Sequence, residues 1–228
     1  MGDHVSDDES EEEKVLKVVV VGDGASGKTS ICQRFAKETF DKSYHQTLGL
    51  DFFSRRIILP GDVQALVQVW DIGGQSIAGE MIDKYLVGAN IVMLVYDVTN
   101  LKSFDNAQDW LSLVRRVTKT QEKQPHIVLM GNKTDLEEKR LVSVEAHNNM
   151  ATNHGLTPVY VSAKTGDTVL LTFRQAVAEV LKIALSKADV EADIAIVKGT
   201  VVEPSRGVES TASVRRSEAR GTAVCSIS

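Results

Sequence analysis

The chain has 228 residues, of which 43% are hydrophobic and 25% charged, as expected for one globular domain of moderate size with terminal extensions. The net charge of −5 comes from residues 1–13, which hold seven acids and no Lys or Arg, while the remainder holds 24 acids and 26 bases. This near-neutral remainder excludes the basic field of a nucleic-acid-binding protein. Two cysteines exclude a disulfide framework or a cysteine metal cluster and favour a reducing, intracellular setting.

Apolar runs alternate with helical patterns from Lys14 to about Leu185. In chain order we predict a strand at 15–21, a helix at 28–37, antiparallel strands at 52–59 and 65–71, a strand at 91–96, a helix at 103–119, a strand at 127–130, a polar surface helix at 143–154, a strand at 159–161 and a helix at 170–185. Such alternation predicts an α/β fold, a doubly wound sheet of six strands that is mostly parallel with one antiparallel edge strand and has helices on both faces. Ligands of such sheets bind beyond the carboxyl ends of the strands.

The composition divides the chain into three parts. Residues 1–13 are expected to be a disordered acidic tail, residues 14–186 the globular domain, and residues 187–228 a flexible tail. No apolar run reaches the length of a membrane span, and the acidic N-terminus does not resemble a signal peptide. Attachment to a membrane would therefore need a lipid or a partner.

The segment GDGASGKT, residues 22–29, matches the pattern G-x-x-x-x-G-K-[ST] between a predicted strand and a predicted helix. Gly22 and Gly27 allow backbone N–H groups to curl around phosphate oxygens, and the helix N-terminus adds its positive dipole end. Lys28 supplies a point charge for the terminal phosphates, and the Thr29 hydroxyl can ligate Mg²⁺. The motif therefore predicts a phosphate-binding loop.

The segment GNKTD, residues 131–135, selects the base. Guanine presents a ring N–H and an exocyclic amine side by side, and the single carboxylate of Asp135 can accept both. Adenine has an acceptor in place of the ring N–H, so the lone pair of its ring nitrogen would face the lone pairs of the Asp135 carboxylate. Lys133 would cover the base with its aliphatic stem, and Ala163 in the segment SAK, residues 162–164, would offer its backbone N–H to the guanine carbonyl.

The segment WDIGGQ, residues 70–75, follows the second antiparallel strand. Asp71 can hold Mg²⁺ directly or through water, the Gly74 N–H can sense a γ-phosphate, and Gln75 would orient the attacking water. Two consecutive glycines make this stretch easy to reorganise, which suits a segment that one ligand state orders and another releases.

With these motifs in order, residues 14–185 resemble a Ras-like small GTPase of the Rab subfamily, and an outlying member more than a mainstream one. The resemblance implies a GDP/GTP switch that hydrolyses GTP with Mg²⁺ and recruits effectors in membrane trafficking. Its switch threonine matches Thr47, and the aromatic that packs on guanine matches Phe40. Gly24 occupies the position at which a side chain usually abolishes hydrolysis. In mainstream members Thr-Ala and a Glu stand where this chain has Ile72-Gly73 and Ser76.

The predicted sites can be stated together. We expect catalytic roles for Lys28, Thr47 and Gln75, and magnesium ligands in Thr29, Thr47 and Asp71. Nucleotide contacts are expected from Gly22, Gly24, Ala25, Ser26, Gly27, Lys28, Thr29, Ser30, Phe40, Thr47, Gly74, Asn132, Lys133, Asp135, Ser162, Ala163 and Lys164. The resemblance also implies an effector-facing aromatic cluster of Phe52, Trp70 and Tyr85, although packing between the switches explains these aromatics equally well.

The chain ends in CSIS, which matches the C-a-a-X prenylation pattern and favours a farnesyl group on Cys225. One lipid gives marginal, reversible membrane binding, so we expect a monomer that cycles between the cytosol and the cytoplasmic face of membranes. The resemblance implies an exchange factor, an activating protein, effectors and a prenyl-binding chaperone as partners. Gly2 and Ser6 also fit an N-myristoylation pattern, but the neighbouring acids oppose binding to anionic lipid, and we interpret that match as accidental.

Two other functions fit a phosphate-binding loop less well. A phosphotransferase for a small substrate would need a substrate-binding lid, and the connections at 99–103 and 155–161 leave no room for one. A nucleotide-loaded scaffold without turnover would not need Gly24, Thr47 and Gln75 together.

Overall fold

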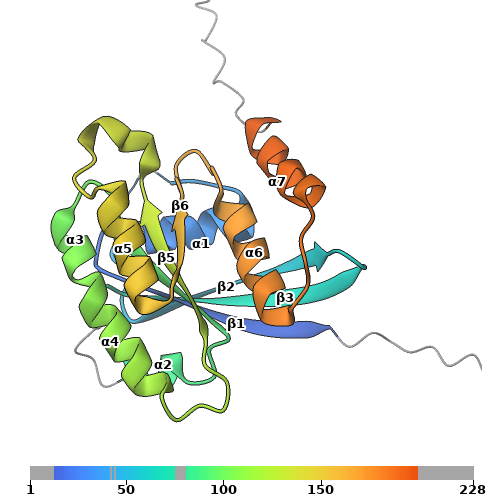
Figure 1. Cartoon of the computed structure of the whole chain (residues 1–228), viewed down its shortest axis with the longest axis horizontal. Helices are drawn as coiled ribbons and strands as arrows, with labels where there is room; N and C mark the ends of the chain where they lie inside the picture. The colour runs from blue at the N-terminus through green and yellow to red at the C-terminus, as the bar shows by residue number, and fades with distance from the viewer. Residues whose placement is uncertain (1–12, 42, 44, 75–80, 200–228) are drawn as a thin grey trace, which may run out of the picture.

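The computed structural model describes residues 13–199, except residues 42, 44 and 75–80. A twisted six-stranded sheet forms its centre (Figure 1). Its order is β2-β3-β1-β4-β5-β6, and the strands are β1 (Lys14–Val21), β2 (Leu50–Leu59), β3 (Val63–Ile72), β4 (Ile91–Asp97), β5 (His126–Asn132) and β6 (Thr157–Tyr160). Edge strand β2 pairs antiparallel with β3, and the other pairings are parallel, which confirms the predicted fold class.

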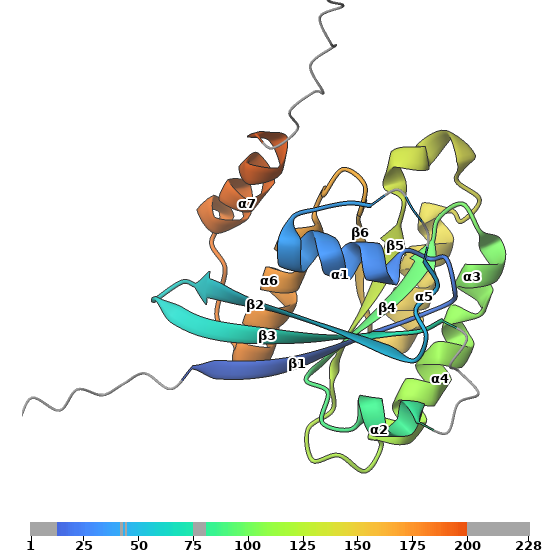
Figure 2. The same ribbon diagram turned by 180° about the vertical axis from the view of Figure 1, so that it is seen from behind.

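Helices cover both faces of the sheet. α1 (Lys28–Lys37) and α6 (Val169–Leu181) pack on one face. α2 (Ile82–Leu86), α3 (Leu101–Asp105), α4 (Ala107–Thr118) and α5 (Val144–His154) pack on the other. Figure 2 shows the same layers from behind, with α1 toward the viewer and α4 and α5 on the side away from α6. None of the helices in the described part of the chain combines the length and apolarity that a bilayer crossing requires.

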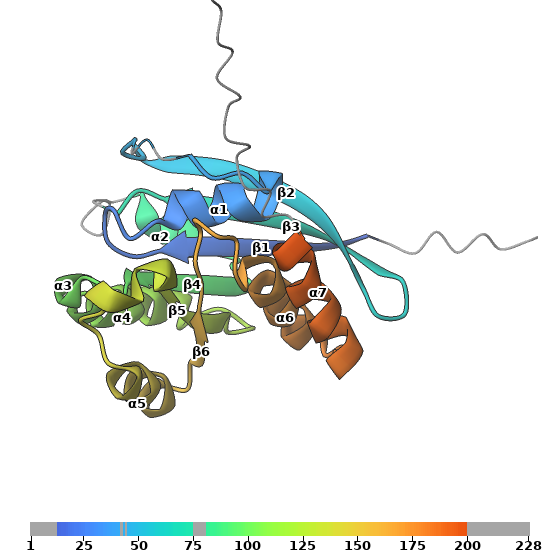
Figure 3. The same ribbon diagram turned by 90° about the horizontal axis from the view of Figure 1, so that it is seen from above.

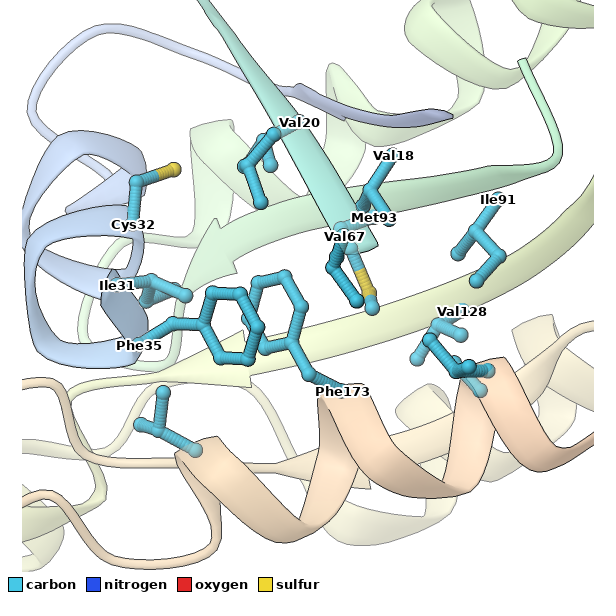
Figure 4. Close-up of a cluster of buried hydrophobic side chains, with 14 of the residues drawn as sticks. Val18, Val20, Ile31, Cys32, Phe35, Val67, Ile91, Met93, Val128 and Phe173 are labelled. Carbon is cyan, nitrogen blue, oxygen red and sulfur yellow. The ribbon is translucent and has the colours of Figure 1, made fainter. Parts of the chain in front are cut away.

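The sheet separates two apolar clusters. In β1, Val18 and Val20 point into the cluster under α1 and α6, whereas Val19 and Val21 point into the other. This alternation of contacts within one apolar run is what a strand covered on both faces requires. Figure 4 shows the first cluster, where the rings of Phe35 from α1 and Phe173 from α6 stack with centroids 3.9 Å apart. These helices fix the position of the phosphate-binding loop, since α1 begins directly after it.

The flexible tail that we expected from residue 187 begins instead as a helix, α7 (Lys187–Gly199), which lies beside α6 (Figure 3). The backbone N–H of Ser186 donates to Asp189 Oδ2 at 2.8 Å, and the N–H of Asp189 donates back to Ser186 Oγ at 3.2 Å. This reciprocal capping box starts the helix. Arg174 of α6 then pairs with Asp193 of α7, whose side chain is 3% exposed. Local capping and a buried ion pair therefore order residues that composition alone assigned to a tail.

Other predicted elements also differ from the structure, and α6 ends at Leu181 rather than at residue 185. The helix predicted at 103–119 is divided at Asn106 into α3 and α4. The short helix α2 and the 3-10 helix η2 (Thr134–Lys139) were not predicted. The polar surface helix at 143–154 exists as α5, but His147, which we expected at the surface, is fully buried. The His147 ring stacks on Tyr160, with centroids 4.4 Å apart, and its Nδ1 lies 2.8 Å from the Tyr96 hydroxyl.

Candidate nucleotide-binding site

A cavity of about 330 Å³ lies at the carboxyl end of the parallel strands. The segments that follow β1, β5 and β6 meet there, although they are far apart in sequence. Most of the predicted contact residues line it: Gly24, Ala25, Gly27, Lys28, Thr29, Ser30, Phe40, Thr47, Gly74, Asn132, Lys133, Asp135, Ala163 and Lys164. Gly22, Ser26 and Ser162 do not line the cavity but hold residues that do. Gln75 and Cys225 lie outside the described residues.

The phosphate-binding loop needs glycine at two positions for steric reasons. Gly22 has φ +137°, and a Cβ atom there would lie 2.0 Å from the Val95 carbonyl oxygen. Gly27 has φ +90°, and a Cβ atom there would lie 2.3 Å from Asn132 Nδ2. Ala25 has φ 60°, in the left-handed region that costs a non-glycine residue about 1 kcal/mol or more. The loop is therefore held in a strained arc around the cavity.

Lys28 is buried beneath this arc. Its Nζ donates to the carbonyl oxygens of Gly22 and Asp23 at 2.8 and 2.9 Å. Burial lowers the pKa of Lys28, and the negative charges of Asp71 and Asp23 oppose that lowering. The ammonium is thus fixed to the loop backbone by two bonds and retains one N–H, since an ammonium carries three donors. This arrangement suits a terminal phosphate.

Three oxygen-bearing side chains meet at the first turn of α1. Thr29 Oγ1 lies 2.8 Å from Thr47 Oγ1 and donates to Asp71 Oδ2 at 2.5 Å, while Thr47 Oγ1 lies 3.4 Å from the same oxygen. Burial raises the pKa of Asp71, against hydrogen bonds from both threonines and the charge of Lys28. Its Oδ1 is buried and has no hydrogen-bond partner among the described residues.

These oxygens fit a small, hard cation. Octahedral Mg²⁺ binds oxygen at 2.0–2.1 Å, which separates neighbouring ligand oxygens by about 2.9 Å, close to the observed spacing of the two hydroxyls. Within residues 13–199, apart from the gaps given above, no three His, Cys, Asp or Glu side chains form a metal cluster. A cation here would therefore depend on hydroxyls, one carboxylate and ligand phosphates, as is usual for Mg²⁺.

Gly74 lies against the phosphate-binding loop. A Cβ atom at this position would be 2.2 Å from the Gly24 nitrogen and 2.4 Å from the Asp23 carbonyl carbon. A Cβ atom on Gly24, in contrast, would have no heavy atom within 4 Å. A side chain at position 24 would therefore extend into the cavity. The segment after β3 can therefore approach the loop only with glycine at position 74.

The base side of the cavity is tied to the phosphate side by Asn132, which ends β5, and by Lys133, which follows it. Asn132 Nδ2 donates to the Ser26 carbonyl at 2.9 Å, and its Oδ1 accepts the Ala163 N–H at 3.1 Å. Lys133 Nζ donates to the Ala25 carbonyl at 2.8 Å and pairs with Asp97 at 2.6 Å. The lysine stem therefore spans the cavity wall between the loop and β4.

Asp135 retains capacity for two more hydrogen bonds. Its Oδ1 accepts from Ser162 Oγ at 2.7 Å, and its Oδ2 lies 3.3 Å from Lys164 Nζ. A carboxylate has about four lone-pair sites, so one site remains on each oxygen. Its side chain is 11% exposed and lines the cavity. This is the acceptor pair that adjacent N–H donors of a planar base require.

Sequence reasoning missed part of the wall. The cavity is also lined by Gln33, Asp41, Ser43, His45, Gln46 and Leu136. Asp97, the ion-pair partner of Lys133, was also missed, although it ends β4 and the rule that ligands bind at the carboxyl ends of strands would have indicated it. Asn106 and Trp110, which donate hydrogen bonds to Asp23, give no local signal in the sequence.

The predicted aromatic cluster forms across β2, β3 and α2. The ring centroids of Phe52 and Trp70 are 6.0 Å apart, and those of Trp70 and Tyr85 are 6.2 Å apart. Trp70 and Tyr85 pack against the second core cluster, and Phe52 is 50% exposed. Lys17 Nζ lies 4.0 Å from the Trp70 ring centroid, a cation–π distance. The cluster therefore both packs on the core and presents an apolar edge.

Comparison with known proteins agrees with this geometry. The model of the Ras family matches residues 17–182. The chain is 69% identical over 225 residues to Ras-related protein Rab-28 of Caenorhabditis elegans, covering 99% of this chain and 91% of the relative. It is 35% identical over 187 residues to the Ypt/Rab-type GTPase YPT7 of Saccharomyces cerevisiae, covering 80% of this chain and 88% of that protein. The expected resemblance to an outlying Rab is confirmed: this chain belongs to the Ras family and, within it, to the Rab subfamily of small GTPases, close to Rab-28.

Proposed function

We propose that the cavity binds GTP or GDP together with Mg²⁺, and that the segments carrying Thr47 and Gly74 respond to the γ-phosphate. The protein is a Rab-type GTPase, a GDP/GTP switch that hydrolyses GTP in intracellular membrane trafficking. The observation that carries the site assignment is the meeting of a base-reading carboxylate and a phosphate-binding loop in one cavity. Asn132 joins the two halves by hydrogen bonds.

For the phosphates, we assign Lys28 and the backbone N–H groups of residues 24–30. Lys28 keeps its ammonium at the loop with two carbonyl contacts, which leaves its third N–H for phosphate oxygen. The positive end of α1 adds to this attraction. Thr29, Thr47 and Asp71 would hold Mg²⁺, which neutralises charge on the β- and γ-phosphates. The unpartnered Asp71 Oδ1 supports this assignment.

For hydrolysis, we assign Gln75 as the residue that orients the attacking water and Gly74 as the N–H that contacts the γ-phosphate. Gly74 supports this role because it already packs against Gly24 of the loop. Thr47 lies beside Thr29 and completes the same corner of the cavity. Loss of the γ-phosphate removes the ligand shared by these segments, which is how hydrolysis would release both.

Guanine selection by Asp135 can be tested directly. In Asp135→Asn an amide replaces one carboxylate oxygen with a donor, which opposes the exocyclic amine of guanine but suits the second carbonyl of xanthine. Loss of two charge-assisted hydrogen bonds should weaken GDP binding about a hundredfold or more. Binding of xanthosine diphosphate should rise correspondingly, as measured by competition against a fluorescent nucleotide.

The matched control is Glu138→Gln, which makes the same chemical change at an exposed position of η2. It should leave both affinities at wild-type values. Unchanged GDP affinity in Asp135→Asn would refute the assignment of base recognition to this carboxylate.

As a Rab GTPase, the protein works with regulators and effectors. We propose that Phe52, Trp70 and Tyr85 contact effectors, supported by the exposed edge of Phe52. We also propose that an exchange factor and an activating protein control a monomeric chain, and that a farnesyl group on Cys225 attaches it to the cytoplasmic face of membranes. A prenyl-binding chaperone would return it to the cytosol, because one lipid binds membranes reversibly.

A further inference from the structure

Asp23 introduces a negative charge into a loop that must bind phosphate. It stands between Gly22 and Gly24, its carbonyl oxygen accepts from Lys28 Nζ at 2.9 Å, and its charge acts on Lys28. A carboxylate free to turn toward this ammonium would compete with phosphate oxygens and would repel them. The loop therefore needs a reason for this side chain to stay away from the cavity.

Two donors from one helix supply that reason. Asn106 Nδ2 donates to Asp23 Oδ2 at 2.6 Å, and Trp110 Nε1 donates to Asp23 Oδ1 at 3.0 Å. The two residues are four positions apart at the start of α4, so they share one face of the helix. Each carboxylate oxygen thus has its own neutral donor, more than 80 residues away in sequence.

The donors are well suited to hold a fixed position. Trp110 is 1% exposed and packs in the second core cluster, so its indole cannot move independently of α4. Asn106 forms the junction of α3 and α4, and its side chain makes no capping bond to α4. Its amide is therefore not needed to start the helix, and its contact with Asp23 can be removed alone.

We propose that Asn106 and Trp110 are positioning residues that hold the Asp23 carboxylate away from Lys28 and the phosphates, and thereby raise nucleotide affinity. The same contact fixes the Asp23–Gly24 peptide, against which Gly74 packs. This inference depends on phosphate binding at the loop, as proposed above.

A double-mutant cycle tests the proposal. Asn106→Ala frees one carboxylate oxygen, and the dissociation constant of fluorescent GDP should rise about tenfold, the size expected for a hydrogen bond to a charged group. In the Asp23→Ala background the carboxylate is absent, so Asn106→Ala should change the constant by less than about twofold. Trp110→Phe, which keeps an aromatic ring but removes the N–H donor, should show the same dependence on Asp23.

The control is Gln108→Ala, at an exposed position on the same helix, which should bind GDP as the wild type does. In ¹⁵N spectra of the GDP-bound proteins, the indole N–H resonance of Trp110 should differ between the wild type and Asp23→Ala. An unchanged constant in Asn106→Ala would overturn the proposal. If Asn106→Ala lowered GDP affinity equally with Asp23 and with Ala at position 23, the proposal would also be overturned, since the effect would then be structural. Wild-type protein that fails to bind GDP would overturn the proposed function together with this inference.

Discussion

The buried histidine of α5 should make folding stability depend on pH in a defined window. His147 is fully buried between the Tyr96 hydroxyl and the Tyr160 ring. The guanidinium of Arg140 lies over the same Tyr160 ring, 4.8 Å from its centroid. Burial, followed by the positive charge of Arg140, lowers the pKa of His147 to about 4 from its ordinary 6.5. The folded protein therefore resists protonation of this ring.

The sign and size of the effect follow from that difference. Well above pH 6.5 the ring is neutral in both states and contributes no pH dependence. As the pH falls from 6.5 to 4, the unfolded chain binds a proton that the folded chain does not, so the free energy of unfolding decreases. The full difference corresponds to about 1.4 kcal/mol per pKa unit, and because each state is half-protonated at one end of this range, the loss between pH 6.5 and 4 is about 2–3 kcal/mol.

The comparison uses His147→Gln, whose amide can still bond the Tyr96 hydroxyl but cannot titrate. We expect this variant to lose less stability than the wild type between pH 6.5 and 4, by about 2–3 kcal/mol, in urea unfolding with saturating GDP and Mg²⁺. His154→Gln, on the same helix but partly exposed, is the matched control. The carboxylates titrate equally in both proteins. Parallel plots of unfolding free energy against pH for the wild type and His147→Gln would therefore refute the reasoning.

Three further predictions concern the switch and the lipid. Gln75→Leu should slow single-turnover GTP hydrolysis by up to about a hundredfold, with GDP affinity unchanged, because the attacking water loses its orientation; equal turnover would assign that role to another group. Gly74→Ala should lower the affinity for a non-hydrolysable GTP analogue about tenfold relative to GDP, since the new Cβ atom would lie 2.2 Å from the Gly24 nitrogen and force the segments apart; an unchanged ratio would contradict the contact. Cys225→Ser should move the protein from the membrane to the soluble fraction of cells, and persistent membrane association would point to a different anchor.

Strands β1, β4 and β5 were predictable because they are buried on both faces along most of their length. All seven residues of β4 are buried, and its apolar run was predicted at 91–96 against Ile91–Asp97 in the structure. Helix α1 coincides with its predicted range, since the glycine motif fixes its start. The edge strand β6 was placed two residues late, at 159–161, because its first half, Thr157 and Pro158, is exposed and gives no apolar signal.

Two of the failures depend on contacts between residues distant in sequence. His147 stands in a polar stretch, and only the approach of Tyr96 and Tyr160 makes its position buried. Helix α7 has a local signal in the capping pair Ser186 and Asp189, which we did not use, but its docking depends on Arg174 of α6. Motif chemistry predicted many of the residues that line the cavity, whereas it did not predict which of them bond each other.

Those bonds divide the site into a fixed part and a responsive part. Asn132 and Lys133 link the base side to the carbonyls of Ser26 and Ala25, so the base and phosphate positions are joined by the protein itself. Thr47 and the segment after β3, in contrast, meet the site through Thr29, Asp71 and the close approach of Gly74. A cation and a γ-phosphate would add contacts to this second group and few to the first. Affinity for either nucleotide should therefore depend mainly on the fixed part. The difference in affinity between GTP and GDP should depend on the responsive part.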